Sequence, residues 1–344
     1  KQLGVALFEK LGLPAKKKTK SGYSTGAEVL EGLKNEHPAV SLLLNYRQLA
    51  KLKSTYADGL QDCIAEDGRI HSTFNQTEAR TGRISSLEPN LQNIPVRTAE
   101  GRRLREYFNA PAGRVLCDAD YSQIELRVLA SMSGDANMIN AFGSGTDIHT
   151  VTASQVFGLP QDMITPELRS RAKAVNFGIV YGIGAFSLSK DIGVTRAEAD
   201  RYIKSYLAAY PDVAAYMEKA IDDAKKNGYV TTLYGRRRYI PELSNSNGNM
   251  RAFGERVARN APIQGTAADI IKIAMIKVSR SLKDEFPTAR LILQVHDELI
   301  VECDEKDAEG VCALLEREME SAADLAVSLT AEAHFGKTWL EAKA

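Results

Sequence analysis

The chain has 344 residues, and its 44 Lys and Arg residues are balanced by 44 Asp and Glu residues, so it does not bind polyanions through overall charge as a histone-like protein would. An apolar share of 44% is ordinary for a globular protein with a buried core and excludes a disordered or collagen-like chain. No apolar run approaches the roughly 18 residues of a membrane span, so we expect no membrane partner.

The spacing of apolar residues predicts more helices than strands. In chain order, we expect helices over 1–13 and 39–57, a short strand over 69–74, a loop over 80–97, a strand over 114–117 and a helix over 122–132. Residues 140–240 are expected to be mostly helical, followed by a long helix over 262–283, two strands within 290–302 and a last helix over 307–323. Sparse strands among long helices, without regular alternation of the two, indicate an α+β fold.

The charges are distributed unevenly along the chain. Residues 1–110 carry 17 basic and 12 acidic residues, and residues 161–260 carry 16 and 11. Residues 111–160 carry 2 basic and 5 acidic residues, and residues 261–344 carry 9 and 16. Most of the C-terminal acids can be interpreted as solvated helix faces. The alternative is that two basic surfaces grip a polyanion while an acidic centre between them binds metal ions.

The chain start and the cysteines indicate the setting of the protein. Lys1 is preceded by neither an initiator Met nor an apolar leader, which is typical of a fragment. The four cysteines, Cys63, Cys117, Cys303 and Cys312, show no CxxC spacing. They predict reduced thiols in a cytoplasmic protein and argue against a zinc site.

Two segments place carboxylates at strand ends. Two apolar runs meet at His296, Asp297 and Glu298, where adjacent carboxylates repel unless a divalent cation neutralises them. A solvent-exposed hairpin turn would tolerate these acids equally well. Asp118 and Asp120 share one face of another strand, although Asp120 can also be a turn residue before a helix. Two such strand ends favour a shared two-metal site suited to phosphoryl transfer.

A third segment begins with Thr165, Pro166 and Glu167, the residues of a helix start. Four side chains that follow are spaced four apart and form one stripe along the helix: Arg169, Lys173, Phe177 and Tyr181. The stripe can be a solvated basic start followed by two core aromatics. It can also be a surface that binds a triphosphate with its cations and stacks a base on its aromatics.

Together, these three segments resemble the family A DNA polymerases, and their order along the chain also agrees. Residues 120–127 are similar to motif A of that family, residues 169–182 to motif B and residues 294–298 to motif C. Further similar stretches are 81–83, 91–95, 147–149 and 260–269, and the resemblance extends from residue 1 to Trp339. Phage-type RNA polymerases share the general plan but differ after the two motif Asp residues, so Ser122–Glu125 and Glu298 favour DNA synthesis.

The resemblance implies a right-hand polymerase fold with an antiparallel palm sheet, helical fingers and part of a helical thumb. The implied domains are a partial thumb over 1–65, the palm over 66–139 and 250–344, and the fingers over 140–249. Family members carry the rest of the thumb and an exonuclease-like domain before this point. We expect a monomer, for which a separate N-terminal fragment is one way to complete the thumb.

The implied reaction adds dNTPs to a primer 3′-hydroxyl on a DNA template and releases pyrophosphate, in DNA replication and repair. Asp120, Asp297 and the backbone carbonyl of Tyr121 would hold two Mg²⁺ ions, for which Mn²⁺ can substitute. Glu298 would support these ligands, and Lys173 is a candidate to protonate the leaving group.

The resemblance also implies how the nucleotide is bound. Arg169 and Lys173 would hold the triphosphate, and Glu125 would leave no room for a ribose 2′-hydroxyl. The remaining residues expected at the nucleotide are His149 and Gln123 beside the phosphates, Phe177 against the sugar and base, and Tyr181 at the template-base stacking position until the fingers close.

DNA contacts are expected in the minor groove, where A·T and T·A present equivalent acceptors and pairing can be checked without reading sequence. The residues implied are Arg83, Arg256, Asn260 and Gln264 near the primer terminus, His296 by the terminal nucleotide, and Lys51 and Lys53 on duplex phosphates. Without the resemblance, each would be interpreted as an ordinary polar surface residue.

Two other interpretations stay open. One is an inactive DNA-binding fragment of the same kind of polymerase, and the other is a metal-dependent nuclease, since paired carboxylates also serve hydrolysis. Neither protein would extend a primer with dNTPs. In each case we expect a bacterial cytoplasmic protein associated with the nucleoid.

Overall fold

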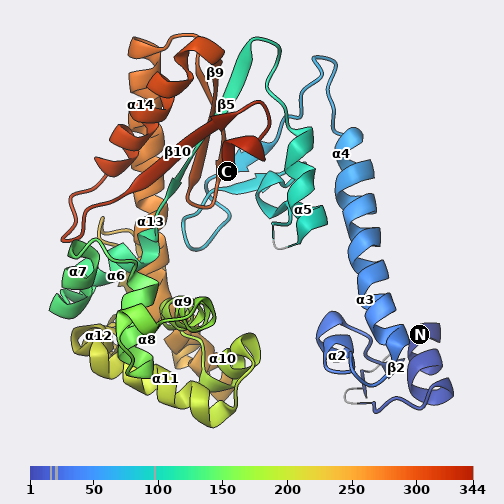
Figure 1. Cartoon of the computed structure of the whole chain (residues 1–344). Coiled ribbons are helices and arrows are strands. Elements are labelled where there is room, and N and C mark those ends of the chain that lie inside the picture. The colour runs from blue at the N-terminus through green and yellow to red at the C-terminus, as the bar shows by residue number, and fades with distance from the viewer. Residues whose placement is uncertain (16–17, 20–21, 97, 344) are drawn as a thin grey trace. The chain divides into compact units, whose positions relative to one another are not determined.

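The computed structural model describes residues 1–15, 18–19, 22–96 and 98–343 (Figure 1). The chain divides into two compact units, of which the first comprises residues 1–73 and 87–104. The second comprises residues 74–86 and 105–344. The expected boundaries of thumb, palm and fingers stay a prediction.

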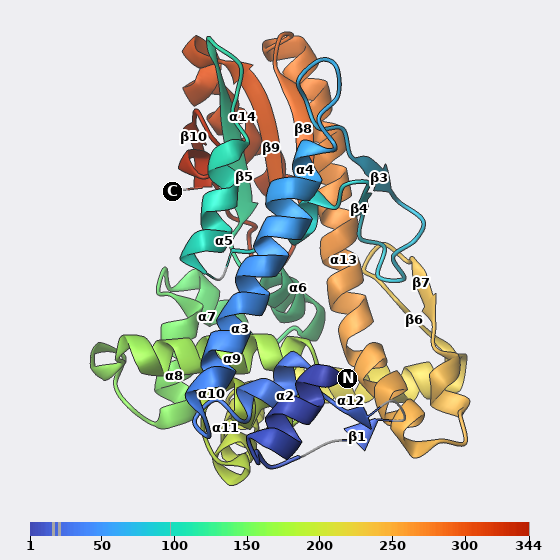
Figure 2. The ribbon, with the colours of Figure 1, turned by 90° about the vertical axis from the view of Figure 1, so that its right-hand side faces the viewer.

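The first unit is dominated by one long helical rod. It begins as α3 (Pro38–Lys51) and continues through a π-helical stretch, η2 (Leu52–Asp58), into α4 (Gly59–Gln61), so the helix predicted over 39–57 is confirmed (Figure 2). Pro38 occupies the first helical position, and the His37 ring nitrogen Nδ1 accepts a hydrogen bond from the backbone N–H of Ala39 at 3.1 Å.

A small apolar core surrounds the start of this rod. It contains Leu7, Leu30, Leu33 and Val40, all fully buried or nearly so. The helix predicted over 1–13 is confirmed over residues 2–10 and ends there. The elements of this unit besides the rod are α1 (Gln2–Val5), η1 (Ala6–Lys10), β1 (Lys18–Thr19), β2 (Gly22–Tyr23), α2 (Ala27–Glu31), η3 (Leu91–Asn93) and α5 (Ala99–Arg103).

The second unit is built on a four-stranded antiparallel sheet with the strand order β10-β5-β9-β8. Its strands are β5 (Arg114–Tyr121), β8 (Arg290–Val295), β9 (Glu298–Asp304) and β10 (Ala331–Gly336). The helices α13 (Gly248–Glu285) and α14 (Ala308–Glu320) lie against this sheet (Figure 1). The two strands predicted within 290–302 and the helix over 307–323 are therefore confirmed, as is the α+β class.

A helical layer is inserted in the chain between β5 and β8. It consists of α6 (Ile124–Ser133), α7 (Ala136–Gly143), α8 (Ile148–Phe157), α9 (Pro166–Val180), α10 (Ala185–Ile192), α11 (Arg196–Ala209) and α12 (Pro211–Asn227). Its apolar faces join those of the sheet and of α13 in one large core, which includes Val128, Val180 and Val278. The shorter elements are η4 (Leu104–Tyr107), η5 (Gln161–Met163), η6 (Pro241–Ser244), η7 (Glu305–Asp307) and η8 (Glu341–Lys343).

Several predicted elements need correction. Only residues 73–74 of the strand expected over 69–74 belong to a strand, β3 (Thr73–Asn75). The expected loop over 80–97 contains β4 (Ser85–Leu87) and η3. Residues 140–240 are mostly helical, as predicted, but the stretch ends in an unpredicted hairpin of β6 (Tyr229–Thr231) and β7 (Arg237–Tyr239). These strands have three residues each, too few for an alternating pattern to be detected.

The long helix α13 begins 14 residues before its predicted start at Pro262. The prediction placed the start there, and a proline usually opens or kinks a helix. Pro262 instead lies buried inside α13, where tertiary packing offsets the lost hydrogen bond. The strand β10 was not predicted, since its alternation of small and polar residues resembles a loop.

Two further expectations concern the thiols and the membrane. The four cysteines form no disulfide in the structure, and the Sγ atoms of Cys117 and Cys303 lie 3.5 Å apart in the core; the reduced state stays a prediction. Within the described ranges, no helix is both long and apolar enough to cross a membrane.

Candidate active site

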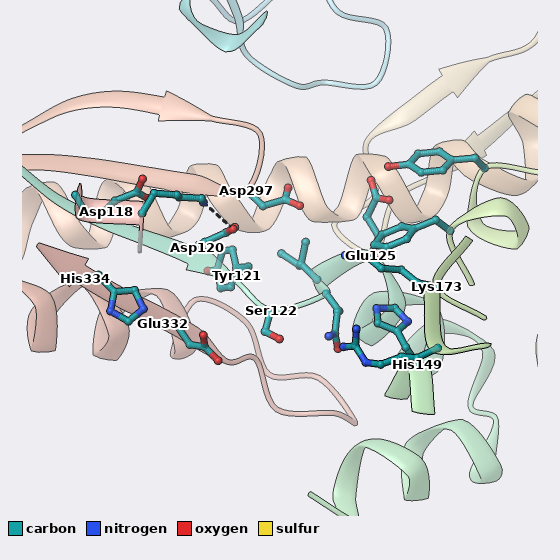
Figure 3. Close-up of a pocket in the computed structure, with 17 residues that line it drawn as sticks. Asp118, Asp120, Tyr121, Ser122, Glu125, His149, Lys173, Asp297, Glu332 and His334 are labelled. Atoms are coloured by element: carbon teal, nitrogen blue, oxygen red, sulfur yellow. Dashed lines mark hydrogen bonds and ion pairs between the residues drawn. The ribbon is translucent and has the colours of Figure 1, made fainter. Parts of the chain in front are cut away.

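The two acidic strand ends meet in one cavity of about 470 Å³ (Figure 3). In the register of β5 and β9, Asp120 lies directly opposite Glu298. The backbone N–H of Tyr121 donates a hydrogen bond to the carbonyl oxygen of Asp297 at 3.2 Å. Sheet pairing therefore brings together two segments that are more than 170 residues apart in the sequence.

The cavity wall contains most of the side chains that the sequence singles out. Ten of the predicted site residues line it: Asp120, Tyr121, Gln123, Glu125, His149, Arg169, Lys173, Phe177, Tyr181 and Asp297. The other lining residues are Asp118, Ser122, Ile124, Glu332, His334, Ala342 and Lys343.

The backbone turns sharply at both acidic strand ends. Gln123, between β5 and α6, has a φ of 53°, and His296, between β8 and β9, has a φ of 52°. Positive φ is uncommon for residues other than glycine and concentrates at functional sites. His296 directly precedes Asp297, and Gln123 directly follows Ser122, and both of these neighbours line the cavity.

Two acidic side chains that line the cavity, Asp118 and Asp297, resist ionisation. Burial raises the pKa of Asp297 to about 7, and the neighbouring carboxylates of Glu125, Asp120 and Glu298 add to this effect, whereas Arg83 opposes it. Burial also raises the pKa of Asp118 to about 7, with a contribution from the carboxylate of Glu298. A cation in this cavity would favour the ionised form of these groups.

Lys343, near the C-terminus, is a site residue that sequence reasoning missed. Its Nζ lies 2.9 Å from Oδ2 of Asp120 and 2.6 Å from Oε1 of Glu298 (Figure 3 shows the first contact as a dashed line). The indole N–H of Trp339 donates to Oδ2 of Asp118 at 3.1 Å. No motif or periodicity marks this C-terminal segment, so nothing in the sequence indicated that it enters the cavity.

The opposite wall is formed by α9, whose predicted start is confirmed. The Thr165 hydroxyl accepts a hydrogen bond from the N–H of Leu168, and Pro166 is the first helical residue. Arg169 donates from Nε and Nη2 to the two carboxylate oxygens of Asp147, each at 2.9 Å. Although burial opposes the shift, hydrogen bonds from Arg169 and Thr150 lower the pKa of Asp147. The guanidinium is therefore held in a fixed orientation beside the cavity.

The rest of the stripe follows along the helix. Lys173 is exposed, and its Nζ lies 6.0 Å from the ring centroid of Phe177. The rings of Phe177 and Tyr181 are stacked with their centroids 6.5 Å apart, and His149 lies 5.8 Å from Phe177. No carboxylate is paired with Lys173 in the part of the chain that the structure describes, so its charge is available to an anion.

His149 is held in its neutral form. It is 1% exposed, and burial lowers its pKa to about 4. The Asn176 amide nitrogen lies 3.0 Å from Nδ1 of His149 and donates to it, which leaves the ring proton on Nε2.

Glu125 connects the cavity to a turn that carries Arg83. Nη2 of Arg83 donates to Oε1 of Glu125 at 2.7 Å, and burial raises the pKa of this carboxyl group. The phenol of Tyr181 lies in the same cluster, where burial and then the Glu125 carboxylate raise its pKa to about 12.

The other predicted residues lie outside the cavity lining. The Asn260 amide on α13 donates to the carbonyl oxygen of Tyr181 at 2.7 Å, and the Arg256 guanidinium lies 5.7 Å from the ring centroid of Phe253. Gln264 is half-buried on α13, and His296 is exposed in its turn. Lys51 and Lys53 belong to the first unit, where Nζ of Lys53 lies 2.6 Å from Oδ2 of Asp58.

Arg236 is a second residue whose role the sequence did not indicate. It donates to Oδ1 of Asp269 at 2.8 Å and to the backbone carbonyls of Thr81 at 2.8 Å and Gly265 at 2.9 Å. Its hydrogen bonds therefore connect the turn that precedes Arg83 to α13.

The capacity for metal ions rests on oxygen atoms. Among the described residues, no three His, Cys, Asp or Glu side chains are gathered as a metal site made of side chains alone would require. Buried carboxylate oxygens that accept no hydrogen bond are nevertheless present on Asp118 (Oδ1), Glu125 (Oε2) and Glu298 (Oε2), the last of which lies 3.9 Å from Nη1 of Arg105. Asp120 and Asp297 fit a site completed by a backbone carbonyl, water and the oxygens of a bound phosphate, which is how Mg²⁺ is commonly held.

Comparisons with known proteins agree with the motifs. A family model described as DNA polymerase family A matches residues 1–341. The DNA polymerase I of Geobacillus stearothermophilus is 51% identical over 345 residues, and that of Bacillus subtilis is 52% identical over 346 residues. Each alignment covers 100% of this chain and 39% of the relative, so the chain spans about two fifths of the length of these curated relatives.

A solved structure is also similar over the whole chain. It is the POL domain of Pol1 from M. smegmatis, in complex with DNA primer-template and dNTP. It matches with a TM-score of 0.94 and 46% identity, covering 100% of this chain and 61% of that chain. This likeness confirms the polymerase fold that the three motifs predict.

Proposed function

The chain belongs to DNA polymerase family A, and we propose that it performs template-directed DNA synthesis, adding dNTPs to a primer 3′-hydroxyl with release of pyrophosphate. The observation that carries the proposal is one cavity in which Asp120 and Asp297 face the cations of α9, Arg169 and Lys173. Carboxylates suited to metal ions thus lie opposite cations suited to a triphosphate.

The cofactor that we propose is a pair of Mg²⁺ ions, for which Mn²⁺ can substitute. Asp120, Asp297 and the backbone carbonyl of Tyr121 would hold them, supported by Glu298. When bound, the ions would lower the pKa of the primer 3′-hydroxyl and neutralise charge on the leaving pyrophosphate. The buried Oδ1 of Asp118, which accepts no hydrogen bond, and the raised pKa of Asp297 support this fit, because a nearby cation would stabilise the ionised form of both carboxyl groups.

The protein's own side chains bind and orient the nucleotide. Arg169, fixed by Asp147, and the exposed Lys173 hold the triphosphate, with Gln123 and neutral His149 beside it. Lys173 is the candidate to protonate the pyrophosphate as it leaves. Phe177 packs on the sugar and base, and Tyr181, stacked on Phe177, occupies the template-base position until the fingers close.

Selection of the correct nucleotide rests on buried polar groups. Glu125 lies under the sugar and leaves no room for a 2′-hydroxyl. The residues proposed to contact the minor groove are Arg83, Arg256, Asn260 and Gln264, with His296 beside the terminal nucleotide. The hydrogen bond between Arg83 and Glu125 supports this assignment, because it joins a groove residue to the sugar-selecting residue.

The proposed partners are primer-template DNA and dNTPs. The first unit, as the thumb, would touch duplex phosphates through Lys51 and Lys53. A further helical segment, supplied by a separate N-terminal fragment, would complete the thumb of a monomer by covering α3. The exposed stripe on α3 supports this, since Leu42, Tyr46 and Leu49 are 70%, 69% and 46% exposed. We place the protein in the bacterial cytoplasm at the nucleoid.

Primer extension with Mg²⁺ and four dNTPs tests the function. Extension by the chain, lost in Asp120→Ala and in Asp297→Ala, is the expected result. The exposed Asp222 on α12 provides a matched control, because Asp222→Ala removes an equal charge outside the cavity lining. Primer shortening that needs no dNTPs would favour the metal-dependent nuclease, and tight duplex binding without chemistry would favour the inactive binding fragment.

A further inference from the structure

The C-terminal segment places a fixed ammonium group among the carboxylates of the cavity. Nζ of Lys343 lies 2.9 Å from Oδ2 of Asp120 and 2.6 Å from Oε1 of Glu298, so one cation bridges two strands. These two carboxylates are direct neighbours in the register of β5 and β9. Without Lys343, like charges would stand opposite each other at the ends of the two central strands, where Nη1 of Arg105, 3.9 Å from Oε2 of Glu298, would pair with one of them.

The ammonium is placed by a rigid anchor. Trp339 is 1% exposed, its backbone N–H donates to the carbonyl of Phe108 at 2.9 Å, and its ring meets that of Phe108 edge-on at 5.5 Å. The Arg105 guanidinium lies 4.2 Å from the centroid of the Trp339 ring. Ala342, next to Lys343, is fully buried. The backbone that leads to Lys343 is therefore held in the core, which limits the positions that the Lys343 ammonium can occupy.

An ammonium and a divalent cation compete for these ligands. Both seek the same carboxylate oxygens, and the two cations would repel each other within a few ångströms. The binding of one must therefore weaken the binding of the other by the same factor, as for any two ligands with overlapping sites.

We propose that Lys343 is a positioning residue that neutralises Asp120 and Glu298 while no metal is bound, and that its ammonium must leave Asp120 when a divalent cation binds there. Lys343 therefore opposes metal binding and holds the carboxylates in place until the cation arrives. The inference rests on the proposed function, because it takes Asp120 as a ligand of a divalent cation.

Binding of Mn²⁺ alone, in the absence of DNA and dNTP, provides the test. Free Mn²⁺ is measured by its electron paramagnetic resonance signal during titration of the protein and of Lys343→Met. We expect the apparent Kd for Mn²⁺ to fall about fivefold or more in the variant, which corresponds to a coupling typical of competing sites. Lys343→Arg, which keeps the charge, should remain near the parent protein.

Lys337 provides the matched control, because its Nζ pairs with Oε2 of Glu305 at 2.6 Å on the same segment but outside the cavity lining. Lys337→Met should leave the Kd unchanged. A Kd for Lys343→Met that equals or exceeds that of the parent overturns the proposal. Should Lys343→Met fold poorly, Lys343→Gln is titrated instead, with the melting temperature in EDTA as the check of folding.

Primer extension at saturating Mg²⁺ separates this inference from the proposed function. If the parent protein extends primers but its Kd for Mn²⁺ does not respond to Lys343→Met, the inference alone is wrong. If the Kd responds as expected but the parent protein does not extend primers, the inference holds and the proposed function is wrong.

Discussion

Nη2 of Arg83 donates a hydrogen bond to Oε1 of Glu125 across 2.7 Å, and this contact joins a loop residue to the first turn of α6. Glu125 is 4% exposed, and burial raises the pKa of its carboxyl group while Arg83 counteracts the shift. Glu125 also adjoins the phenol of Tyr181. A change at Glu125 therefore affects three residues proposed to contact the nucleotide or the primer, namely Glu125 itself, Arg83 and Tyr181.

Glu125→Ala is predicted to raise the use of ribonucleotides relative to deoxynucleotides. The shorter side chain leaves room for a 2′-hydroxyl, and steric discrimination of this kind corresponds to about tenfold to a hundredfold in kcat/KM. Single-nucleotide extension with a matched rNTP and dNTP measures the ratio. Glu125→Gln, which keeps the volume, should change the ratio far less, and equal ratios for Ala and parent would contradict the role of Glu125.

Phe177→Tyr is predicted to relieve discrimination against dideoxynucleotides. Phe177 offers no hydroxyl, so a nucleotide without a 3′-hydroxyl loses a polar group that nothing on the helix replaces. The new phenol supplies one, and we expect the preference for dNTP over ddNTP to fall at least about tenfold. Chain-termination efficiency compares the two proteins. Tyr181→Phe, which removes a hydroxyl from the neighbouring stacked ring, serves as the control and should not reproduce the effect.

The sequence was sufficient for the parts of the site that local pattern determines. Alternation along β5 predicts that Asp118 and Asp120 share a face, and helical spacing predicts the stripe from Arg169 to Tyr181. Both are present, and the cavity contains the acidic and the cationic wall together. The two acidic strand ends already favoured a shared site, but the pairing of β5 with β9 that brings Asp120 to Asp297 leaves no local signal, and the family resemblance was what assigned both residues to one site.

Lys343 and Arg236 show what lay beyond sequence reasoning. Each acts through contacts with residues far away in the chain, as from Lys343 to Asp120 and from Arg236 to Thr81. A solitary lysine in a short C-terminal segment, or one arginine of three in a row, is usually a solvated surface residue. Only the packing of Trp339 and the course of the β6–β7 hairpin bring these cations to their partners.

Arg236→Met is predicted to lower the free energy of unfolding by about 2–3 kcal/mol, because it leaves the carboxylate of Asp269 without its cation and frees the carbonyls of Thr81 and Gly265. Denaturation in urea measures the loss. Arg237→Met is the control, because Arg237 is exposed and contacts the Tyr229 ring, so its effect should stay within about 0.5 kcal/mol. Similar losses in both variants would refute a specific role for Arg236.

Gly82→Ala probes the same turn from the other side. Gly82 has a φ of +81°, and an added Cβ would meet the guanidinium of Arg236. We expect a loss of about 1–3 kcal/mol from backbone strain, together with weaker binding of primer-template DNA, since the turn carries Arg83. Gly113→Ala, at a φ of +78° with open space around it, isolates the backbone contribution and should leave DNA binding intact. Undiminished DNA binding in Gly82→Ala would contradict the link between this turn and Arg83.

The buried neutral imidazole of His149 predicts a dependence of stability on pH. Its pKa is about 4 in the folded protein and about 6.5 when unfolded, so the unfolded chain binds more protons between these values. The free energy of unfolding therefore keeps the full contribution of His149 above pH 6.5. It loses this contribution as the pH falls towards 4, by about 2 kcal/mol between pH 7 and 4.5. Unfolding of the parent and of His149→Gln at both pH values isolates this share, because glutamine can still accept from Asn176 but does not titrate. An equal loss in both proteins, or an NMR titration of His149 near 6.5, would show that the ring is not held neutral by burial.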